Sequence, residues 1–329
     1  DGGSMVFSGE GKLQAEAARF QEDMLITDIK KSGGIKPVKI SRSKNNMGPT
    51  AEVYNALVLG IRDYIEKNGF RSAVIGLSGG IDSAVAAALA AASLGSKNVK
   101  CISMPTVYSS EGTKSDAEKL ASNLGVWFRE VPVQEVYDIF KKLMKPDFSG
   151  MPEDTAEENL QARIRGTVLM TYSNKFGDIV LTTGNKSETS VGYCTLYGDM
   201  AGGFAPLKDV PKTLVYRLAS YINRINKRNI IPSGIIKRPP SAELSENQKD
   251  SDSLPPYDVL DRIIDCFIEK EMDGRAIVDT GIPEKTVREV LSLIYQNEYK
   301  RRQAPPGIKI TPIAFGKDRR MPITNRYRF

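Results

Sequence analysis

Residues 73–83 read Ala-Val-Ile-Gly-Leu-Ser-Gly-Gly-Ile-Asp-Ser, and this stretch decides how the surrounding chain folds. Its first part, Ala73 to Leu77, is a short apolar run with β-branched residues, which is typical of a buried strand. The following residues, Ser83 to Leu94, are rich in Ala and Leu, which favours a helix. A strand that enters a helix through glycines leaves unpaired N–H groups at the positive end of the helix dipole. The stretch therefore predicts a site for phosphate at the junction.

The residues of this junction suggest what kind of phosphate site it is. Gly79 and Gly80 allow the backbone to approach an anion closely, and Ser78 and Ser83 add hydroxyl donors. Asp82 would repel a bare phosphate, so its place in the loop indicates a divalent cation such as Mg²⁺ between the two. Neither the P-loop nor the dinucleotide fingerprint matches here. The alternative is an ordinary glycine-rich turn with a serine N-cap.

Composition excludes several classes of chemistry. The 329 residues include no His, which removes Ser-His-Asp triads, HExxH zinc sites and any histidine general base. The three Cys residues are far apart and form no C-x-x-C motif, so we expect reduced thiols in the cytosol and no zinc knuckle. No run of about 18 apolar residues occurs. We therefore expect a cytoplasmic protein without a membrane partner.

The positive charge is local. The formal net charge is +6, and from Lys300 onward nine basic residues stand against one acidic residue, so the rest of the chain is slightly acidic. A nucleic-acid-binding protein more often spreads its basic residues over a face, so we expect no nucleic-acid partner. The cluster fits a phosphate-bearing small ligand, an acidic partner surface or a solvated basic tail.

The pattern from residue 51 onward alternates between helices and strands. This alternation predicts a doubly wound parallel sheet with flanking helices, in which ligands bind beyond the carboxyl ends of the strands. The predicted strands are Ala73–Leu77, Val99–Met104, Val126–Val131 and Asp178–Thr182, and the predicted helices are Ala51–Asn68, Ser83–Leu94, Ser110–Leu124, Val136–Met144, Thr155–Phe176, Lys212–Asn229, Tyr257–Phe267, Gly274–Thr280 and Pro283–Tyr299.

The two ends of this region read differently. Residues 1–32 contain three short strand-like segments, residues 33–50 form a linker rich in Lys, Ser, Gly and Pro, and residues 51–329 form the main domain. Residues 238–256 are rich in Pro, Ser and acidic side chains, which predicts a surface loop.

Several further side chains are candidates for the site. Thr183 follows a predicted strand, so it can face the same site as the glycine loop. If Asn185 starts a helix, Glu188 lies in its first turn and could share a metal with Asp82, although a carboxylate stabilised by the helix dipole is the alternative. Lys212 opens a predicted helix, where a cation is unfavourable, and this indicates an anionic partner.

Two more segments could contact a ligand. Asn159 and Arg163 are four residues apart on one helical face, which could serve a ligand or form surface ion pairs. Tyr193 and Tyr197 lie in a glycine-rich loop and could stack on a flat ring, although tyrosines more often pack in a core.

Taken together, these segments resemble the NAD⁺ synthetase family. The segments that carry the resemblance are Gly76-Leu-Ser-Gly-Gly-Ile-Asp-Ser83, Glu157-Glu-Asn-Leu-Gln-Ala-Arg-Ile-Arg165, Thr183-Gly-Asn-Lys-Ser-Glu188, Gly192-Tyr-Cys-Thr-Leu-Tyr-Gly-Asp199, Gly203-Phe-Ala-Pro-Leu-Lys-Asp209, Arg238-Pro-Pro-Ser-Ala-Glu-Leu244, Leu254-Pro-Pro-Tyr257 and Asn297-Glu-Tyr-Lys-Arg-Arg302. Other N-type ATP pyrophosphatases share only the first. Leu196 and Tyr299-Lys300 differ from the ammonia-dependent branch and match the glutamine-dependent branch. Residues 1–32 resemble the closing strands of its nitrilase-like amidase domain; an unrelated hairpin extension is the alternative.

The resemblance implies a fold, a reaction and partners. The fold would be that of adenine nucleotide alpha hydrolases. The reaction would be ATP-dependent amidation of deamido-NAD⁺ to NAD⁺ through an adenylated intermediate, with Mg²⁺ and with release of AMP and pyrophosphate. Ammonia would come from glutamine in full-length relatives and from solution for this chain alone. Family members form homodimers or larger assemblies. The alternatives are another ATP-pyrophosphatase amidotransferase and a non-catalytic ATP-binding module.

The resemblance also implies roles for individual residues. The expected catalytic residues are Asp82, Lys212 and Asp199, of which Asp199 would help receive ammonia, and the expected metal ligands are Asp82 and Glu188. The expected ATP contacts are Gly76, Leu77, Ser78, Gly79, Gly80, Ile81, Asp82, Ser83, Thr183, Lys212 and Ser241. The expected deamido-NAD⁺ contacts are Asn159, Arg163, Glu188, Tyr193, Cys194, Thr195, Leu196 and Lys300.

Overall fold

The chain divides into two compact units, Asp1–Gly60 and Ile61–Phe329, in a computed structural model. The structure describes all residues except 1, 30–34, 38–46, 247, 325–326 and 328–329. The two units are described separately below.

The smaller unit contains two short antiparallel strand pairs. β1 (Met5–Phe7) pairs with β2 (Leu13–Glu16), and β3 (Thr27–Ile29) pairs with β4 (Ile35–Pro37). The three strands predicted here are present but shorter. β4 corrects the prediction of a linker at residues 35–37, because Lys36 pairs with Asp28 of β3.

The larger unit is built on a four-stranded parallel sheet, which confirms the predicted fold class. The strands are β5 (Ala73–Gly76), β6 (Val99–Ser103), β7 (Trp127–Glu130) and β8 (Ile179–Leu181), in the order β7-β6-β5-β8. Ile75 lies opposite Cys101 on one side and Leu181 on the other. β5 is therefore an inner strand, buried on both faces, as its apolar sequence predicts.

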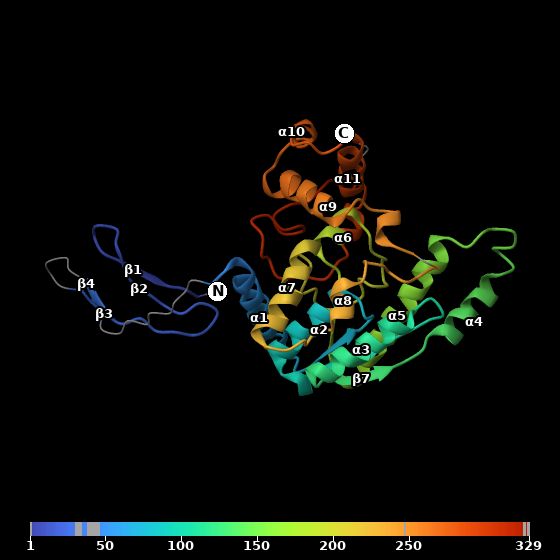
Figure 1. Ribbon diagram of the computed structural model, residues 1–329, viewed down its shortest axis with the longest axis horizontal. Coiled ribbons are helices and arrows are strands. Elements are labelled where there is room, and N and C mark those ends of the chain that lie inside the picture. The colour runs from blue at the N-terminus through green and yellow to red at the C-terminus, as the bar shows by residue number, and fades with distance from the viewer. Residues whose placement is uncertain (1, 30–34, 38–46, 247, 325–326, 328–329) are drawn as a thin grey trace. The chain divides into compact units, whose positions relative to one another are not determined.

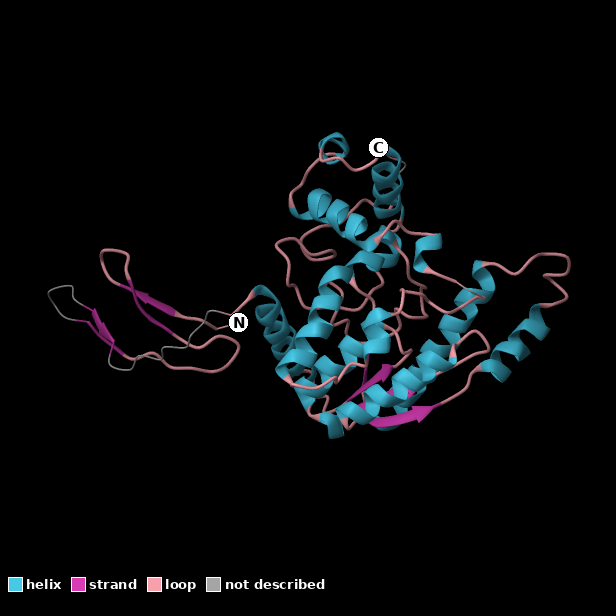
Figure 2. Ribbon diagram, in the orientation of Figure 1, coloured by secondary structure: helices cyan, strands magenta, loops and turns pink. Residues whose placement is uncertain are grey.

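Helices cover the two faces of this sheet (Figure 2). Val74, Ile102 and Val180 share one face and pack against Tyr137 of α4 (Gln134–Met144) and Ile164 of α5 (Thr155–Phe176). α2 (Ile81–Leu94) also packs on β5 and β6, and it lies against α7 (Lys212–Ile225). Because α2 is rich in alanine, most of its surface can be buried between these neighbours.

The remaining helices follow the predicted order with some differences in their ends. α1 spans Pro49–Lys67, and α3 spans Glu111–Leu124 with Ser110 as its cap. Asp154 caps α5. α7 ends four residues earlier than predicted, before Lys227, whose φ of +52° is incompatible with a right-handed helix. Two short helices were not recognised as such from the sequence: α8 (Ser233–Lys237) and the terminal α12 (Glu298–Arg301).

A cluster of helices near the C-terminus forms a second apolar core. α9 (Tyr257–Ile264), α10 (Gly274–Asp279) and α11 (Glu284–Gln296) lie together at the end of the unit away from β7 (Figure 1). A π-helical turn, Asp265–Glu269, continues α9. Leu260, Ile263, Val290 and Ile294 are completely or almost completely buried in this core. α6 (Lys186–Val191) contacts both α9 and α11, so the cluster helps to hold α6 in place.

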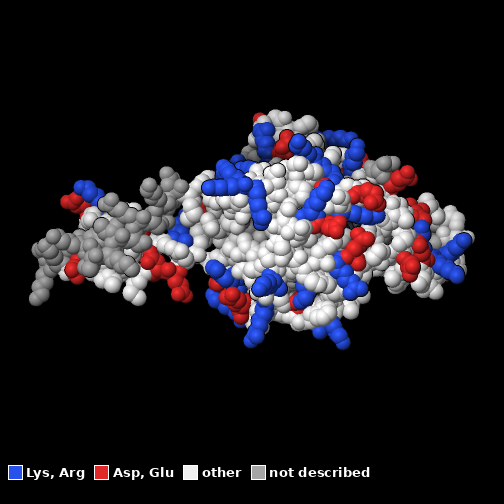
Figure 3. All heavy atoms as spheres, turned by 60° about the horizontal axis from the view of Figure 1, so that its bottom comes forward, with Lys and Arg blue, Asp and Glu red and all other residues white. Residues whose placement is uncertain are grey.

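Of the seven described basic residues from Lys300 onward, four form ion pairs within the unit. Glu298 pairs with Arg301 and Arg302, and Lys309 pairs with Asp318. Arg319 pairs with Glu271. Arg326 and Arg328 lie outside the described residues. On the face drawn in Figure 3, Lys and Arg side chains are interspersed with Asp and Glu side chains.

Among the residues that the structure describes, none of the helices combines the length and apolar character that crossing a bilayer requires.

Candidate active site

A pocket of about 560 Å³ lies beyond the carboxyl ends of β5, β6 and β8. Residues 76–82 form one wall, and residues 102–105 and 181–183 form the neighbouring rim. Residues of α5, α6 and the loop after α6, together with residues 238–244, 248 and 250, line most of the remaining wall. In parallel α/β sheets this edge is where ligands bind, because the connecting loops meet there.

The glycine loop has the backbone geometry of an anion site. Gly79 has a φ of +79°, and a Cβ atom there would lie 2.3 Å from the Thr113 carbonyl oxygen, so only glycine fits. Gly80 is the N-cap of α2 and makes no side-chain cap, which leaves the first turn open to a ligand. The Ser78 and Ser83 hydroxyls lie 3.1 Å apart, and Ser83 donates to the Gly80 carbonyl. Ser83 therefore stabilises the loop through these contacts and does not line the pocket.

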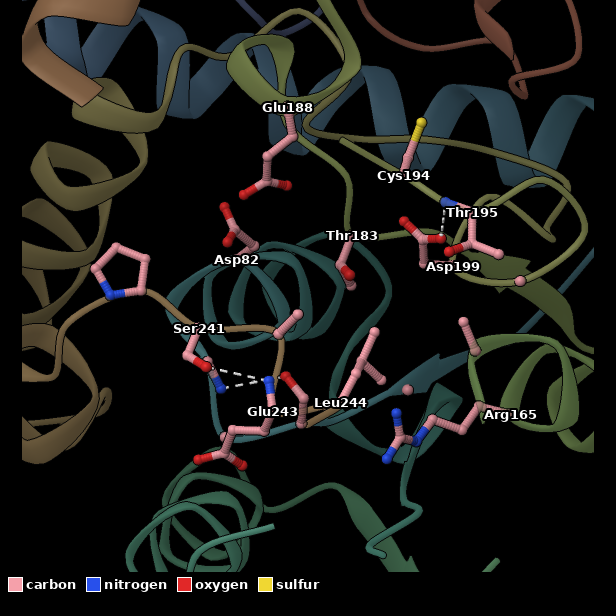
Figure 4. A pocket seen from close by; sticks show the side chains of 18 of the residues that line it. Asp82, Arg165, Thr183, Glu188, Cys194, Thr195, Asp199, Ser241, Glu243 and Leu244 are labelled. Carbon is pink, nitrogen blue, oxygen red and sulfur yellow. Dashed lines mark hydrogen bonds between the residues drawn. The ribbon is translucent and has the colours of Figure 1, made fainter. Parts of the chain in front are cut away.

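Two carboxylates and one ammonium group form the charged centre of the pocket. The Lys212 ammonium donates to Asp82 at 2.6 Å and to Glu188 at 2.8 Å. Figure 4 shows the two carboxylates pointing toward each other from α2 and α6. The sequence predicted an anionic partner for Lys212, and the structure supplies two.

Asn185 links the two carboxylates through the backbone of α6. Its amide donates to Asp82 at 2.9 Å, and its carbonyl oxygen accepts from the Glu188 N–H at 2.9 Å, which makes it the N-cap of α6. Asn185 is completely buried. The conditional prediction of a helix that starts after Asn185 is therefore confirmed.

Burial shifts the ionisation of this centre. Desolvation, together with repulsion from Asp82, raises the pKa of Glu188 to about 7 against the opposing effect of Lys212. Burial by itself lowers the pKa of Lys212, but the two carboxylates more than reverse this and raise it. Lys212 therefore stays charged, while Glu188 can exchange a proton near neutral pH.

The carboxylate pair fits Mg²⁺ as a ligand set shared with phosphates. Within the described ranges, no group of three or more Asp, Glu or Cys side chains is arranged to hold a metal ion. Mg²⁺ in nucleotide sites is commonly held by one or two carboxylates, with phosphate oxygens and waters completing its shell. Asp82 and Glu188 meet this smaller requirement.

A buried acid from residues 238–256 reaches the same centre. Asp250 is 5% exposed and accepts from Tyr257 at 2.7 Å and from Tyr193 at 3.3 Å. The Tyr257 hydroxyl also lies 3.1 Å from Glu188. The prediction of a plain surface loop is thus wrong at this position, because Asp250 and the segment around it line the pocket.

A second group of polar side chains lies across the pocket. Thr195 donates its N–H to Asp199 at 2.6 Å (Figure 4). Its hydroxyl donates to Asn159 at 2.6 Å. Lys300 donates to the carbonyls of Gly192 and Cys194. These donors and acceptors come from α5, the loop after α6 and α12, and they meet only through the fold.

The ionisable groups of this wall are also perturbed. Asp199 is an exposed residue overall, but its carboxylate lies on the pocket wall, where the Thr195 N–H donates to it and protein atoms exclude part of its water. This desolvation raises the pKa of the Asp199 carboxyl to about 6, although hydrogen bonds from the Thr195 segment oppose the shift. Burial raises the pKa of the Cys194 thiol to about 12, so the thiol stays protonated.

Most of the residues predicted for the site line this one pocket. Three do not: Ser83 lies behind the loop, Arg163 is exposed and donates to the Leu196 carbonyl, and Leu196 itself lies outside the lining. Tyr193 lines the pocket, whereas Tyr197 is 69% exposed and bonds to Gln303. The predicted residues that do line it are Gly76, Leu77, Ser78, Gly79, Gly80, Ile81, Asp82, Asn159, Thr183, Glu188, Tyr193, Cys194, Thr195, Asp199, Lys212, Ser241 and Lys300.

Sequence reasoning missed six charged residues of the lining, and it also missed Tyr257, which contacts Glu188; the six are Lys114, Glu158, Arg165, Arg238, Glu243 and Asp250. Arg165 donates to the Met104 carbonyl, and burial lowers its pKa to about 10. Arg238 and Asp250 come from the segment expected to be a surface loop, and Tyr257 from the helix after it. Arg165 could have been predicted, because it lies in the same sequence segment as the predicted site residue Asn159.

The chain that forms this pocket was compared with known proteins, and its sequence matches one family. The sequence model of the NAD synthase family matches residues 53–304. The chain is 45% identical to the glutamine-dependent NAD⁺ synthetase of Aquifex aeolicus, over 99% of this chain and 62% of that protein. The chain thus spans about six tenths of the length of the curated relatives it matches.

Solved structures agree with this result. The glutamine-dependent NAD⁺ synthetase of Acinetobacter baumannii, solved in complex with ADP, is 43% identical with a TM-score of 0.66, over 96% of this chain and 57% of that one. The NMN synthetase of Francisella tularensis is 26% identical with a TM-score of 0.65, over 81% of this chain and 99% of that one.

Proposed function

This chain belongs to the NAD synthase family, and we propose that it catalyses the amidation of deamido-NAD⁺ to NAD⁺ at the expense of ATP. One observation supports this proposal above the others. A glycine loop with the geometry of an anion site, a lysine and two convergent carboxylates share one pocket with a second polar wall.

In this proposal the glycine loop binds the phosphates of ATP. The open first turn of α2, which begins at Ile81 and Asp82, offers backbone N–H groups, and Thr183 and Ser241 contribute hydroxyls from the pocket lining. Mg²⁺, held by Asp82 and Glu188, would supply positive charge to the phosphate oxygens. Lys212, which already contacts both carboxylates, adds a fixed cation beside the α-phosphorus and the departing pyrophosphate.

The opposite wall would bind the dinucleotide acid. Asn159, Thr195, Tyr193 and Lys300 provide donors and acceptors across the pocket from the glycine loop. The substrate carboxylate would attack the α-phosphorus of ATP, which forms an acyl adenylate and releases pyrophosphate. Ammonia would then attack the acyl carbon and release AMP. Positioning and charge neutralisation do most of this work, so the chain needs no histidine.

Asp199 is the proposed acceptor of a proton from ammonium. Its carboxylate lies on the pocket wall, and its raised pKa of about 6 keeps it mostly ionised at neutral pH but more basic than an ordinary aspartate. Ammonium must lose a proton before its nitrogen can attack a carbonyl. Cys194, which stays protonated, is not suited to this step.

For the whole protein we propose glutamine as the nitrogen source, as the names of the relatives suggest, and free ammonia for residues 1–329 alone. A cytoplasmic homodimer or larger homo-oligomer is the proposed working form. Nicotinate mononucleotide is the second candidate acceptor, because an NMN synthetase is among the structural neighbours.

The proposal is tested by supplying ATP, Mg²⁺, ammonium and either deamido-NAD⁺ or nicotinate mononucleotide, and measuring NAD⁺ or NMN together with pyrophosphate. We expect NAD⁺ from the dinucleotide. Asp82→Asn should abolish pyrophosphate release without unfolding the protein. Asp63→Asn is the matched control, because Asp63 is exposed in an ion pair with Lys67 outside the pocket. ATP binding without pyrophosphate release from either acid would favour a non-catalytic nucleotide-binding module.

A further inference from the structure

Arg238 joins the glycine loop to α3 through two separate hydrogen bonds. It follows α8, and its Nη1 donates to the carbonyl oxygen of Gly79 at 3.1 Å. Its Nη2 donates to the carboxylate of Asp116 on α3. The guanidinium side chain is 26% exposed and the Asp116 side chain 12% exposed, so both groups are largely shielded from solvent.

The carbonyl that Arg238 holds belongs to an unusually free peptide. The peptide unit between Gly79 and Gly80 has no Cβ atom on either side, so it can rotate at less steric cost than other peptide units. In a trans peptide the C=O and N–H groups point in opposite directions. With the carbonyl on Arg238, the Gly80 N–H is directed to the Ser78 hydroxyl, 3.2 Å away in the pocket lining.

Rotation of this peptide would reverse the charge that the loop offers. A carbonyl oxygen, which repels phosphate, would then stand where the N–H group now stands beside Ser78. A site for phosphate that contains two adjacent glycines thus needs a contact from outside the loop to keep one orientation. Among the described residues, Arg238 is the side chain that donates to the Gly79 carbonyl.

Two glycines, Gly234 and Gly112, pack closely against the Arg238–Asp116 ion pair. A Cβ atom on Gly234 would lie 2.5 Å from the Asp116 carboxylate, and one on Gly112 would lie 3.2 Å from the Arg238 guanidinium. Asp116 itself is 8% exposed. The guanidinium is therefore fixed by its partner and its packing, independently of any ligand.

We propose that Arg238 is a positioning residue that locks the Gly79–Gly80 peptide in the orientation that accepts the phosphates of ATP, with Asp116 orienting the guanidinium. This inference rests on the proposed function, because it assigns the glycine loop to ATP. The competing possibility is that Arg238 binds a phosphate directly by its charge.

The two possibilities make opposite predictions for the partner of Arg238. If Asp116 orients the lock, Asp116→Asn weakens ATP binding. If Arg238 is a direct phosphate ligand, the same change frees its charge and leaves ATP binding unchanged or tighter. Arg238→Lys separates them again, because lysine keeps the charge but its single nitrogen cannot hold the Gly79 carbonyl and Asp116 in the geometry of a fork.

The experiment measures the binding of ATP, pyrophosphate and deamido-NAD⁺ to the whole chain by calorimetry in the presence of Mg²⁺. The loss of one charge-assisted hydrogen bond corresponds to about a 10- to 100-fold change. We expect Arg238→Met and Arg238→Lys to weaken ATP and pyrophosphate binding by that factor, and Asp116→Asn by a smaller factor. Binding of deamido-NAD⁺ should change less than about two-fold, within the scatter of such measurements.

Arg228→Met is the matched control. Arg228 also donates from its guanidinium to a backbone carbonyl, that of Asn123 at 3.0 Å, but it does not line the pocket. Thermal unfolding of each variant shows whether it is folded, and if Arg238→Met is not, Arg238→Lys decides.

The outcomes separate this inference from the proposed function. ATP binding that is unchanged in Arg238→Lys, or tighter in Asp116→Asn, overturns the lock. Equal losses for ATP and deamido-NAD⁺ also overturn it, because they indicate that Arg238 only anchors residues 239–250. Wild-type protein that binds no ATP overturns the proposed function and the lock together.

Discussion

Replacing Lys212 with methionine removes the ammonium that contacts both Asp82 and Glu188 but keeps a side chain of similar length. Lys212 is 2% exposed, so the change takes a charge from the interior rather than from the surface. The two carboxylates, 18% and 16% exposed, are then left facing each other. Removal of one partner from a buried ion pair typically costs about 3–5 kcal/mol.

The cost should depend on pH because Glu188 can take up a proton. In the folded wild type its pKa is about 7, raised from the ordinary glutamate value. A raised carboxyl pKa means that the folded state binds the proton more tightly than the unfolded state, so this contribution to stability is largest at low pH and is lost as pH rises toward the folded pKa. Without Lys212 the pKa of Glu188 rises further, since the cation that lowers it is gone while Asp82 remains.

Urea unfolding at two pH values measures this effect. At pH 5.5 Glu188 is protonated in both proteins, and we expect the free energy of unfolding to fall by about 1–2 kcal/mol for the lost Asp82 contact. At pH 8.5, where the wild-type pair is ionised, we expect the fall to reach about 3–5 kcal/mol. Mg²⁺ should recover more stability in Lys212→Met than in the wild type, because it can take the place of the ammonium.

The control is Lys67→Met, which removes an exposed ion pair with Asp63 and should change stability by less than about 0.5 kcal/mol. A loss in Lys212→Met that is the same at both pH values would refute the argument that Glu188 and Lys212 are electrostatically linked. An absence of any extra Mg²⁺ effect would remove the support for a metal between the two carboxylates.

Two further predictions concern the second wall of the pocket. Gly177 and Gly192 both cap helices with φ near +72°, but a Cβ atom would meet nothing within 4 Å at Gly177 and would lie 2.2 Å from Asn297 at Gly192. Gly177→Ala should therefore cost about 1–2 kcal/mol of unfolding free energy from backbone strain alone, and Gly192→Ala clearly more; equal losses would show that Asn297 moves aside freely. For Asp199, the rate of NAD⁺ formation at constant ammonium concentration should rise with pH through about 6 as the carboxylate ionises, and Asp199→Asn should remove this step; a step that persists in the variant would exclude Asp199 as the proton acceptor.

The sheet and the phosphate loop could be predicted because their signals are local. Ala73 to Leu77 is apolar at every position up to the loop, and the structure buries β5 on both faces. The regular alternation of strands and helices then limits the fold to a few parallel arrangements. The ends of elements were less predictable, because α7 ends at a left-handed Lys227 that carries no sequence signal.

The contacts around the site could not be predicted, since they join residues far apart in the chain. Arg238 reaches Gly79 across 159 positions, and Tyr257 reaches Glu188 across 69. A single sequence shows that residues 238–256 are polar, and polarity alone favours a surface loop. Asp250 can be buried because two tyrosine hydroxyls satisfy its carboxylate, one from α9 (Tyr257) and one from the loop after α6 (Tyr193).

Lys212 shows that a sequence can predict a long-range contact when a residue stands where its charge is unfavourable. Asp82, Glu188 and Lys212 all lie in the first turns of their helices, α2, α6 and α7, and their mutual contacts bring three positive helix ends to one place. Carboxylates are favoured at such ends, but a lysine is not, so its position costs stability unless anions meet it. Lys212 departs from the preference for anions at helix N-termini, and this departure predicted an anionic partner. Only the fold shows that the partners are Asp82 and Glu188. When both carboxylates are ionised, the three side chains carry a net charge of −1 amid three positive helix ends, and this balance supports the proposal that a metal cation and a phosphate chain bind here.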